Sequence, residues 1–126
     1  MRELSVSGVK SLIFVLSLGI YHELPEPFET WNDQMIGDAL KDYRRAADII
    51  EASDLDYTIL RPAWLTDADE IDFEITQRDE QFKGTEISRK SVGAFVTDIV
   101  ADPSTHARTN VGLNKPDTDG DKPSFY

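Results

Sequence analysis

The fold of this chain is decided by the stretch Asp54-Leu55-Asp56-Tyr57-Thr58-Ile59-Leu60-Arg61-Pro62-Ala63-Trp64-Leu65. Within it, Tyr57 to Leu60 is uncharged and rich in β-branched and aromatic residues, which is typical of a strand covered on both faces in a parallel sheet. Pro62 fixes its φ angle and lacks an N–H, so strand pairing is expected to end there. In open α/β sheets, ligands bind beyond the carboxyl ends of the strands. The stretch therefore predicts a ligand-binding edge at Arg61 to Leu65.

A strand and a helix are predicted before this stretch. Gly8 is a candidate for the end of a helix, and five consecutive apolar residues, Leu12 to Leu16, predict a strand buried on both faces. Residues 21–33 contain prolines and are interpreted as a loop, after which Asn32 or Asp33 caps a helix. The apolar positions of that helix form one stripe at spacings of four and three: Ile36, Leu40, Tyr43, Ala47 and Ile50. Strand, helix and strand in this order make the two strands parallel.

The residues after Leu65 predict a small hairpin. Apolar and acidic residues alternate from Ile71 to Ile75, which favours a strand with one face in water. Lys83-Gly84 is a turn signal, so Thr85 to Ile87 is expected to pair back as the second arm of the hairpin.

A second helix and a last strand complete the predicted elements. Ser88 is a suitable N-cap, and the helix is expected to end before Pro103. Its apolar side comprises Val92, Phe95, Val96, Ile99 and Val100. Asn110 to Leu113 is interpreted as a short strand, and residues 114–126 as an irregular tail.

Composition and charge exclude several classes of function. The 126 residues, 40% of them hydrophobic, suffice for one domain or part of one. Without cysteine the chain has neither disulfides nor thiolate metal sites, which is compatible with a reducing cytoplasm. A net charge of −11 repels nucleic-acid phosphates and anionic lipid, so neither nucleic acid nor a membrane is an expected partner. The apolar run that begins at Leu12 is too short to span a bilayer, and no cleavage site of a signal peptide follows it.

No metal is expected. The acidic groups at residues 67–72 and 117–121 lack the spacing of a calcium loop with its glycine and distal glutamate. His22 and His106 are isolated in the sequence, which leaves no zinc site and no catalytic triad.

Four segments together resemble a known family. They are Val15-Leu16-Ser17-Leu18-Gly19, Arg44-Arg45-Ala46-Ala47-Asp48, Asp56-Tyr57-Thr58-Ile59-Leu60-Arg61-Pro62 and Ile87-Ser88-Arg89-Lys90-Ser91-Val92. They resemble the carboxyl-terminal half of the atypical short-chain dehydrogenases/reductases, which include NmrA-like and NAD-dependent epimerase/dehydratase-like proteins. The likeness covers about residues 8–115. It implies an α/β fold, the carboxyl-terminal part of a Rossmann-like parallel three-layer sheet, with NAD or NADP as cofactor.

The resemblance also implies site residues. The serine after the strand, Ser17, would lie near the substrate and the nicotinamide, and the backbone after Arg61-Pro62 would contact the cofactor. The cofactor contacts implied in this way are Leu16, Ser17, Leu18, Arg44, Pro62, Ala63, Trp64 and Leu65. Ser17 and Tyr21 are the candidate catalytic residues, with Tyr21 as a substitute proton donor.

Each of these residues also has a plainer interpretation. The hydroxyl of Ser17 can form its hydrogen bond with the backbone at the strand end. Tyr21 can pack in a loop without a catalytic role. Arg44 can belong to a solvated helix face, and Trp64 to the core. Arg61 is expected to pair with a carboxylate rather than with a ligand.

Two family features are absent from this sequence. No glycine-rich phosphate turn is present, because the seven glycines are isolated from one another. Leu40 and Arg44 occupy the two positions of the family's Tyr-x-x-x-Lys pair. The phenol of the tyrosine and the amine of the lysine are therefore both absent from these positions. We therefore interpret residues 1–126 as the carboxyl-terminal part of one domain. Its amino-terminal half is then missing or supplied by another chain, or two copies pair as a homodimer.

The predicted function is that of an NAD(P)-binding oxidoreductase or epimerase-like protein. It would act on a small carbonyl or hydroxyl substrate by hydride transfer in the cytoplasm, and the isolated chain would be a poor enzyme. The alternative is a non-catalytic, dinucleotide-sensing regulator of the NmrA-like type. A third interpretation is a structural subunit that completes the sheet of another chain along the edge of Leu12 to Leu16.

Overall fold

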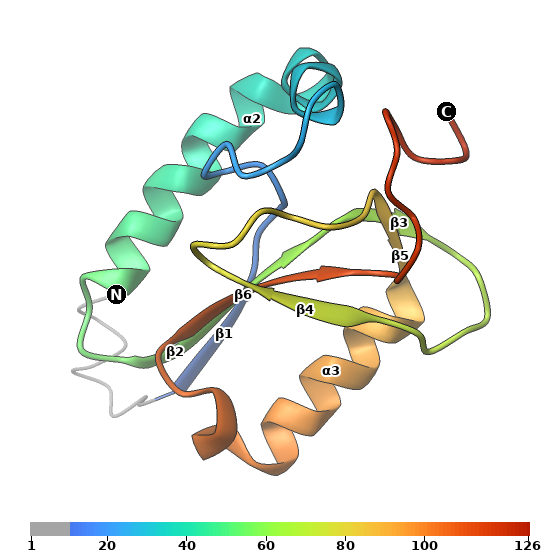
Figure 1. Cartoon of the computed structure of the whole chain (residues 1–126). Helices are drawn as coiled ribbons and strands as arrows, with labels where there is room; N and C mark the ends of the chain where they lie inside the picture. Colours follow the sequence, from blue (N-terminus) through green and yellow to red (C-terminus); the bar gives the residue numbers. More distant parts are fainter. Residues whose placement is uncertain (1–10) are drawn as a thin grey trace.

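The computed structural model describes residues 11–126 (Figure 1). Within this range the main sheet has four strands in the order β1-β2-β6-β4. They are β1 (Ser11–Val15), β2 (Asp56–Pro62), β6 (Thr109–Asn114) and β4 (Glu74–Gln77). β1, β2 and β6 are parallel, and β4 is antiparallel to β6. The helix end predicted at Gly8 lies outside the described residues.

The two long helices cover opposite faces of this sheet, α2 (Phe28–Glu51) on one side and α3 (Arg89–Ala101) on the other (Figure 1). Ile59 packs with the buried residues of α2, whereas its neighbour Leu60 packs with Phe95 and Ile99 of α3. Successive side chains of a strand point to opposite faces, so one buried strand contributes to both layers of the core. The predicted three-layer α/β architecture is confirmed.

The predicted strand, helix and parallel strand are also confirmed. Ser11 of β1 pairs with Asp56 of β2, and Val15 pairs with Leu60. β1 is only partly buried along its length, however, because it lies at the edge of the sheet among the described residues. Ile13 packs against the core on the α3 side, and Leu12 and Phe14 pack against the core on the α2 side, so the strand is covered on both faces as predicted, but its burial is partial.

Helix α2 begins at Phe28, about one turn before the predicted caps. The Glu26 carboxylate accepts hydrogen bonds from the backbone N–H and the hydroxyl of Thr30 and so satisfies a donor of the first turn. Asn32 lies inside the helix, where it is buried. The loop interpretation of residues 28–33 is wrong because a proline just before a helix start is compatible with helix formation.

The predicted hairpin is wrong. Strand β5 (Glu86–Ser88) pairs in parallel with β3 (Trp64–Thr66), and only the end of the predicted wet strand belongs to β4. The cause is a contact distant in sequence. Thr85 donates from its N–H and its hydroxyl to the carbonyl oxygen of Thr118, at 3.2 and 2.7 Å. These bonds hold the segment before β5 against the end of the chain, so it does not fold back on its neighbour.

The second helix agrees with the prediction. Ser88 caps α3, its hydroxyl oxygen accepting from the N–H of Ser91 at 3.0 Å, and the helix ends at Ala101. Val100 is the exception on its apolar side, because it is exposed. A short 3₁₀ helix (Pro103–His106) leads to β6, and residues 115–126 form turns and bends. No helix in residues 11–126 is both long and apolar enough to cross a membrane.

Candidate functional site

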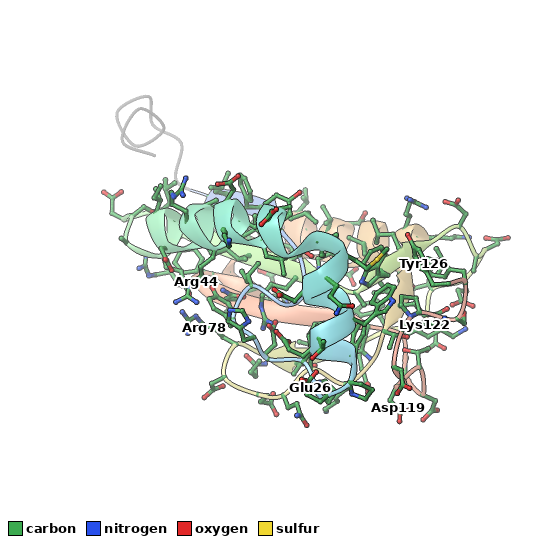
Figure 2. All side chains as sticks on the ribbon, turned by 90° about the horizontal axis from the view of Figure 1, so that it is seen from above. Glu26, Arg44, Arg78, Asp119, Lys122 and Tyr126 are labelled. Carbon is green, nitrogen blue, oxygen red and sulfur yellow. The ribbon has the colours of Figure 1, made fainter. Side chains whose placement is uncertain are left out.

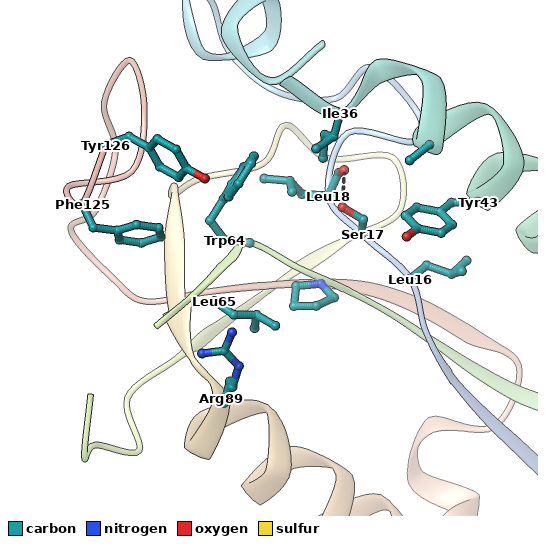
Figure 3. Close-up of a pocket in the computed structure, with 13 residues that line it drawn as sticks. Leu16, Ser17, Leu18, Ile36, Tyr43, Trp64, Leu65, Arg89, Phe125 and Tyr126 are labelled. Atoms are coloured by element: carbon teal, nitrogen blue, oxygen red, sulfur yellow. Dashed lines mark hydrogen bonds between the residues drawn. The ribbon is translucent and has the colours of Figure 1, made fainter. Parts of the chain in front are cut away.

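A cavity of about 510 Å³ lies at the carboxyl ends of β1 and β2 (Figure 3). The segment after β1 forms one wall, because the N–H of Leu16 donates to Leu60 and that of Leu18 donates to Pro62, at 2.8 and 3.1 Å. The residues lining it are Leu16, Ser17, Leu18, Ile36, Ala39, Tyr43, Pro62, Ala63, Trp64, Leu65, Arg89, Phe125 and Tyr126. This is the position at which parallel α/β sheets bind ligands.

Most of the sequence-predicted cofactor contacts meet in this cavity. They are Leu16, Ser17, Leu18, Pro62, Ala63, Trp64 and Leu65, whereas Arg44 and Tyr21 are not among the lining residues. Leu16 to Leu18 and Pro62 to Leu65 lie 44 or more positions apart in sequence yet face each other across the cavity, because β1 and β2 are adjacent and parallel. Their role as contacts of a cofactor stays a prediction.

Three sets of lining residues were not predicted from the sequence. Ile36 and Tyr43 belong to the apolar stripe predicted as the core side of α2, and Ala39, which is not part of that stripe, lies on the same face of the helix. Phe125 and Tyr126 come from the irregular tail, and no local pattern connects them with the strand ends. Arg89 follows the cap of α3 within the segment from Ile87 to Val92, and the resemblance of that segment to the family implies no role for it.

Aromatic side chains build one side of the cavity. Trp64, Trp31 and Tyr126 form a cluster in which each ring contacts the other two, with centroids 5.1 to 5.3 Å apart. Its indole N–H donates to the buried side-chain oxygen of Asn32 at 2.8 Å. Trp64 is therefore fixed in orientation and lines the cavity, although one of its faces packs against the core.

Ser17 is half-buried at the end of β1, and its hydroxyl donates to the carbonyl oxygen of Leu18 at 3.1 Å. The hydroxyl of Ser17 thus forms its hydrogen bond with the backbone at the strand end, as the interpretation without a catalytic role predicts. The bond joins adjacent residues, and Ser17 also lines the cavity, so a ligand carbonyl in the cavity can compete for the hydroxyl.

Arg61 is fully buried and does not line the cavity. Its guanidinium forms an ion pair with Glu23 and donates to the side-chain oxygen of Asn110 at 2.7 Å and to the carbonyl oxygen of Gln77 at 3.3 Å. A buried charge needs such partners, because an unpaired one costs several kcal/mol. The predicted pairing with a carboxylate is confirmed, and Glu23 ties the loop after Ser17 to the sheet.

Tyr21 belongs to a different site. It helps to line a second cavity of about 440 Å³, and its hydroxyl accepts from Asn110 at 2.7 Å and donates to Glu51 at 3.4 Å. Burial, followed by the charge of Glu51, raises the pKa of Tyr21. The expected pairing of Tyr21 with Ser17 as a proton donor is not supported, because these bonds direct the hydroxyl toward the last residue of α2 and the start of β6.

Arg44 is also separate from the cavity at the strand ends. It pairs with Asp48 at 3.0 Å on an exposed part of α2, and its guanidinium lies 4.8 Å from the centre of the Tyr21 ring. Figure 2 shows Arg44 beside Arg78 and distant from Tyr126, which lines the cavity. The predicted contact of Arg44 with the cofactor stays a prediction, and such a contact would lie outside this cavity.

The chemistry of the cavity suits one end of a dinucleotide. Its apolar and aromatic walls fit a flat nicotinamide ring, and Ser17 offers a hydroxyl beside it. It contains no glycine-rich turn for a pyrophosphate. Among residues 11–126, no group of His, Asp or Glu side chains is arranged to hold a metal ion.

A mainly parallel sheet with a cavity at its strand ends and a helix on each face is the arrangement of Rossmann-like nucleotide-binding domains. Residues 2–103 match the model of the NAD(P)H-binding family, so the chain belongs to this family. No curated protein matches the sequence.

Solved structures agree with this assignment. A short-chain dehydrogenase/reductase from Veillonella parvula DSM 2008 in complex with NADP is 34% identical over 98% of this chain, with a TM-score of 0.91. A Rossmann-fold NAD(P)-binding family protein from Shigella flexneri is 55% identical over 99% of this chain, with a TM-score of 0.76. An anaerobillin reductase from Escherichia coli O157:H7 is 26% identical over 94% of this chain, with a TM-score of 0.79.

The chain spans only part of these proteins. It covers 59% of the Veillonella chain, 55% of the Shigella chain and 56% of the Escherichia chain. The predicted resemblance to short-chain dehydrogenases/reductases and the predicted Rossmann-like fold are confirmed.

Proposed function

We propose that this chain forms the nicotinamide and substrate side of an NAD(P)-dependent oxidoreductase or epimerase-like protein that acts on a small carbonyl or hydroxyl compound. The observation that carries the proposal is the cavity in which Ser17 faces Pro62 to Leu65 at the carboxyl ends of adjacent parallel strands. The similarity to a dehydrogenase/reductase in complex with NADP and to an anaerobillin reductase supports it. The absence of cysteine supports a reducing compartment, and we propose the cytoplasm.

When bound, the nicotinamide supplies a hydride to a carbonyl carbon, while a proton from solvent adds to the oxygen and the carbonyl becomes an alcohol. Pro62, Ala63 and Leu65 line the cavity and would hold the ring by backbone and apolar contact, which would keep water from the reacting groups. Ser17 gives up its bond to Leu18 and donates to the carbonyl oxygen, which fixes the orientation of the substrate.

The test uses reduced nicotinamide riboside, which contains the ring and one ribose but no phosphate. The chain is expected to bind it, with a change in tryptophan fluorescence, and to bind adenosine monophosphate much more weakly, because the cavity holds only the nicotinamide end. Leu65→Glu introduces a charge at the cavity wall and should weaken binding of the riboside by about tenfold or more.

Ile49→Glu is the matched control, since Ile49 is an exposed apolar residue of α2 that does not line the cavity. It should leave binding unchanged. The proposal fails if the riboside does not bind, or if both variants bind it as tightly as the unchanged chain does.

A non-catalytic, dinucleotide-sensing regulator of the NmrA-like type is the second candidate. The position of Tyr21 outside the cavity favours it, as do Leu40 and Arg44 at the two places of the Tyr-x-x-x-Lys pair. NADPH binding without oxidation across a panel of aldehydes and ketones would support the regulator. Oxidation of NADPH by the unchanged chain that is lost in Ser17→Ala would support the enzyme.

A further inference from the structure

We infer that the ligand sharing this cavity with the nicotinamide is a planar aromatic compound that carries a carboxylate, with its ring against Trp64, Phe125 and Tyr126 and its carboxylate on Arg89. The inference names the substrate class of the proposed function and rests on it. It follows from the distribution of charge and of aromatic side chains around one cavity.

Arg89 has the only charged side chain among the residues that line the cavity in the described part of the chain. It is the first residue of α3, and Figure 3 shows its guanidinium pointing toward Leu65. The other lining residues are apolar or aromatic, apart from the hydroxyl of Ser17. A cavity with one cation in an apolar wall selects an apolar ligand with one acidic group.

The present partner of Arg89 can be displaced. Asp67 accepts from Arg89 at 2.5 Å, but the two side chains are 88% and 58% exposed, respectively. Exposed ion pairs of this kind contribute little to stability. A ligand carboxylate in the cavity can form two parallel hydrogen bonds with the guanidinium, whereas Asp67 contacts it through one oxygen.

The aromatic wall offers a stacking surface beside this cation. Phe125 and Tyr126 are 50% and 53% exposed, and their ring centroids lie 5.4 Å apart. Exposed aromatic residues gathered at the mouth of a cavity are typical of a binding surface. The Glu86 carboxylate accepts from the N–H and the hydroxyl of Ser124 at 2.7 and 2.9 Å, which holds both rings over the cavity.

Two fluorescent probes with the same ring skeleton separate the contributions of ring and charge. One is 1-anilinonaphthalene-8-sulfonate, which is an anion, and the other is N-phenyl-1-naphthylamine, which is neutral. Both should bind the native chain, with energy transfer from tryptophan. Arg89→Gln should weaken binding of the anion by about tenfold and leave binding of the neutral probe unchanged.

Arg45→Gln is the matched control, because Arg45 is an exposed arginine of α2 that does not line the cavity. It should change neither affinity. Phe125→Ala should weaken both probes, since it removes part of the stacking surface. The inference is overturned if Arg89→Gln affects both probes equally, or if it affects neither.

These outcomes are separate from those of the proposed function. Binding of nicotinamide riboside without an Arg89-dependent preference for the anion would overturn the substrate class and leave the function standing. An Arg89-dependent preference without riboside binding would support an aromatic anion site and overturn the assignment of the cavity to a nicotinamide.

Discussion

At the scale of single residues, the buried polar groups lie behind the cavity and fix the loop that carries Ser17. Arg61, Glu23 and Asn110 are joined by hydrogen bonds, and Asn110 also binds the Tyr21 hydroxyl. The sequence predicted that Arg61 pairs with a carboxylate, because a charge at the end of a buried strand needs a partner. It could not identify Glu23, which lies 38 positions earlier.

Tyr21 provides a pH-dependent test of this buried group. Its pKa is raised above the ordinary value of 10.0, first by burial and then by the charge of Glu51. Below pH 10 the phenol is neutral in both states, so its contribution to stability is fully present. Above the ordinary value the unfolded chain loses the proton first, and stability falls as the pH rises through the pKa of the folded state. Urea unfolding measured from about pH 9 to about pH 11 should show this fall.

The matched pair for this experiment is Tyr21→Phe and Tyr43→Phe. Tyr21→Phe should remove part of the alkaline fall, because a phenylalanine has no proton to lose. Tyr43 is exposed on α2, so the second variant should retain the fall seen in the unchanged chain. Identical alkaline slopes in the two variants would contradict the assignment.

At the scale of elements, the sequence predicted those whose signals are local. Leu12 to Leu16, the Tyr57 to Leu60 run and the Ser88 cap each contain their own evidence of strand or helix, and the structure has them at those places. The pairing of β5 with β3 depends on Thr118, and the aromatic wall depends on the tail. Contacts between distant segments leave no periodic pattern, so these features were not predictable.

Two glycines test the elements around the cavity with opposite expected signs. Gly19 has a φ of +88°, and a Cβ atom there would lie 2.7 Å from the side-chain nitrogen of Asn32. Gly19→Ala should therefore destabilise the protein by about 1 kcal/mol or more. Gly93 lies in α3 with nothing within 4 Å of an added Cβ atom. Gly93→Ala should stabilise by about 0.5–1 kcal/mol.

Thermal and urea unfolding of the two variants measure these changes directly. Both replace a glycine with an alanine, so they differ only in backbone conformation and surroundings. Stabilisation by Gly19→Ala would show that the turn after Ser17 does not need its left-handed conformation. Destabilisation by Gly93→Ala would show that the exposed face of α3 is covered.

At the scale of the whole molecule, the arrangement of strands bears on what the chain assembles with. β1 lies at one edge of the four-stranded sheet in residues 11–126, and its middle residues are partly buried and apolar. The similar structures are longer, since this chain spans 55–59% of the three chains compared above. An edge strand of this kind is a template for pairing with a further strand. We propose that this edge pairs with an amino-terminal half of the domain or with a second copy of the chain.

The edge proposal predicts self-association of the isolated chain, measured by light scattering over a wide range of concentration. Val15→Lys places a charge on β1 at a residue that is 47% exposed, so the chain should fold and associate several times more weakly. Ile49→Lys adds the same charge at an exposed apolar residue of α2, away from the edge, and should associate like the unchanged chain. Because the net charge of −11 falls by the same amount in both variants, a difference between them reports on the strand edge rather than on general repulsion. A monomer at every concentration, with one sharp cooperative unfolding transition, would mean that β1 needs no partner strand.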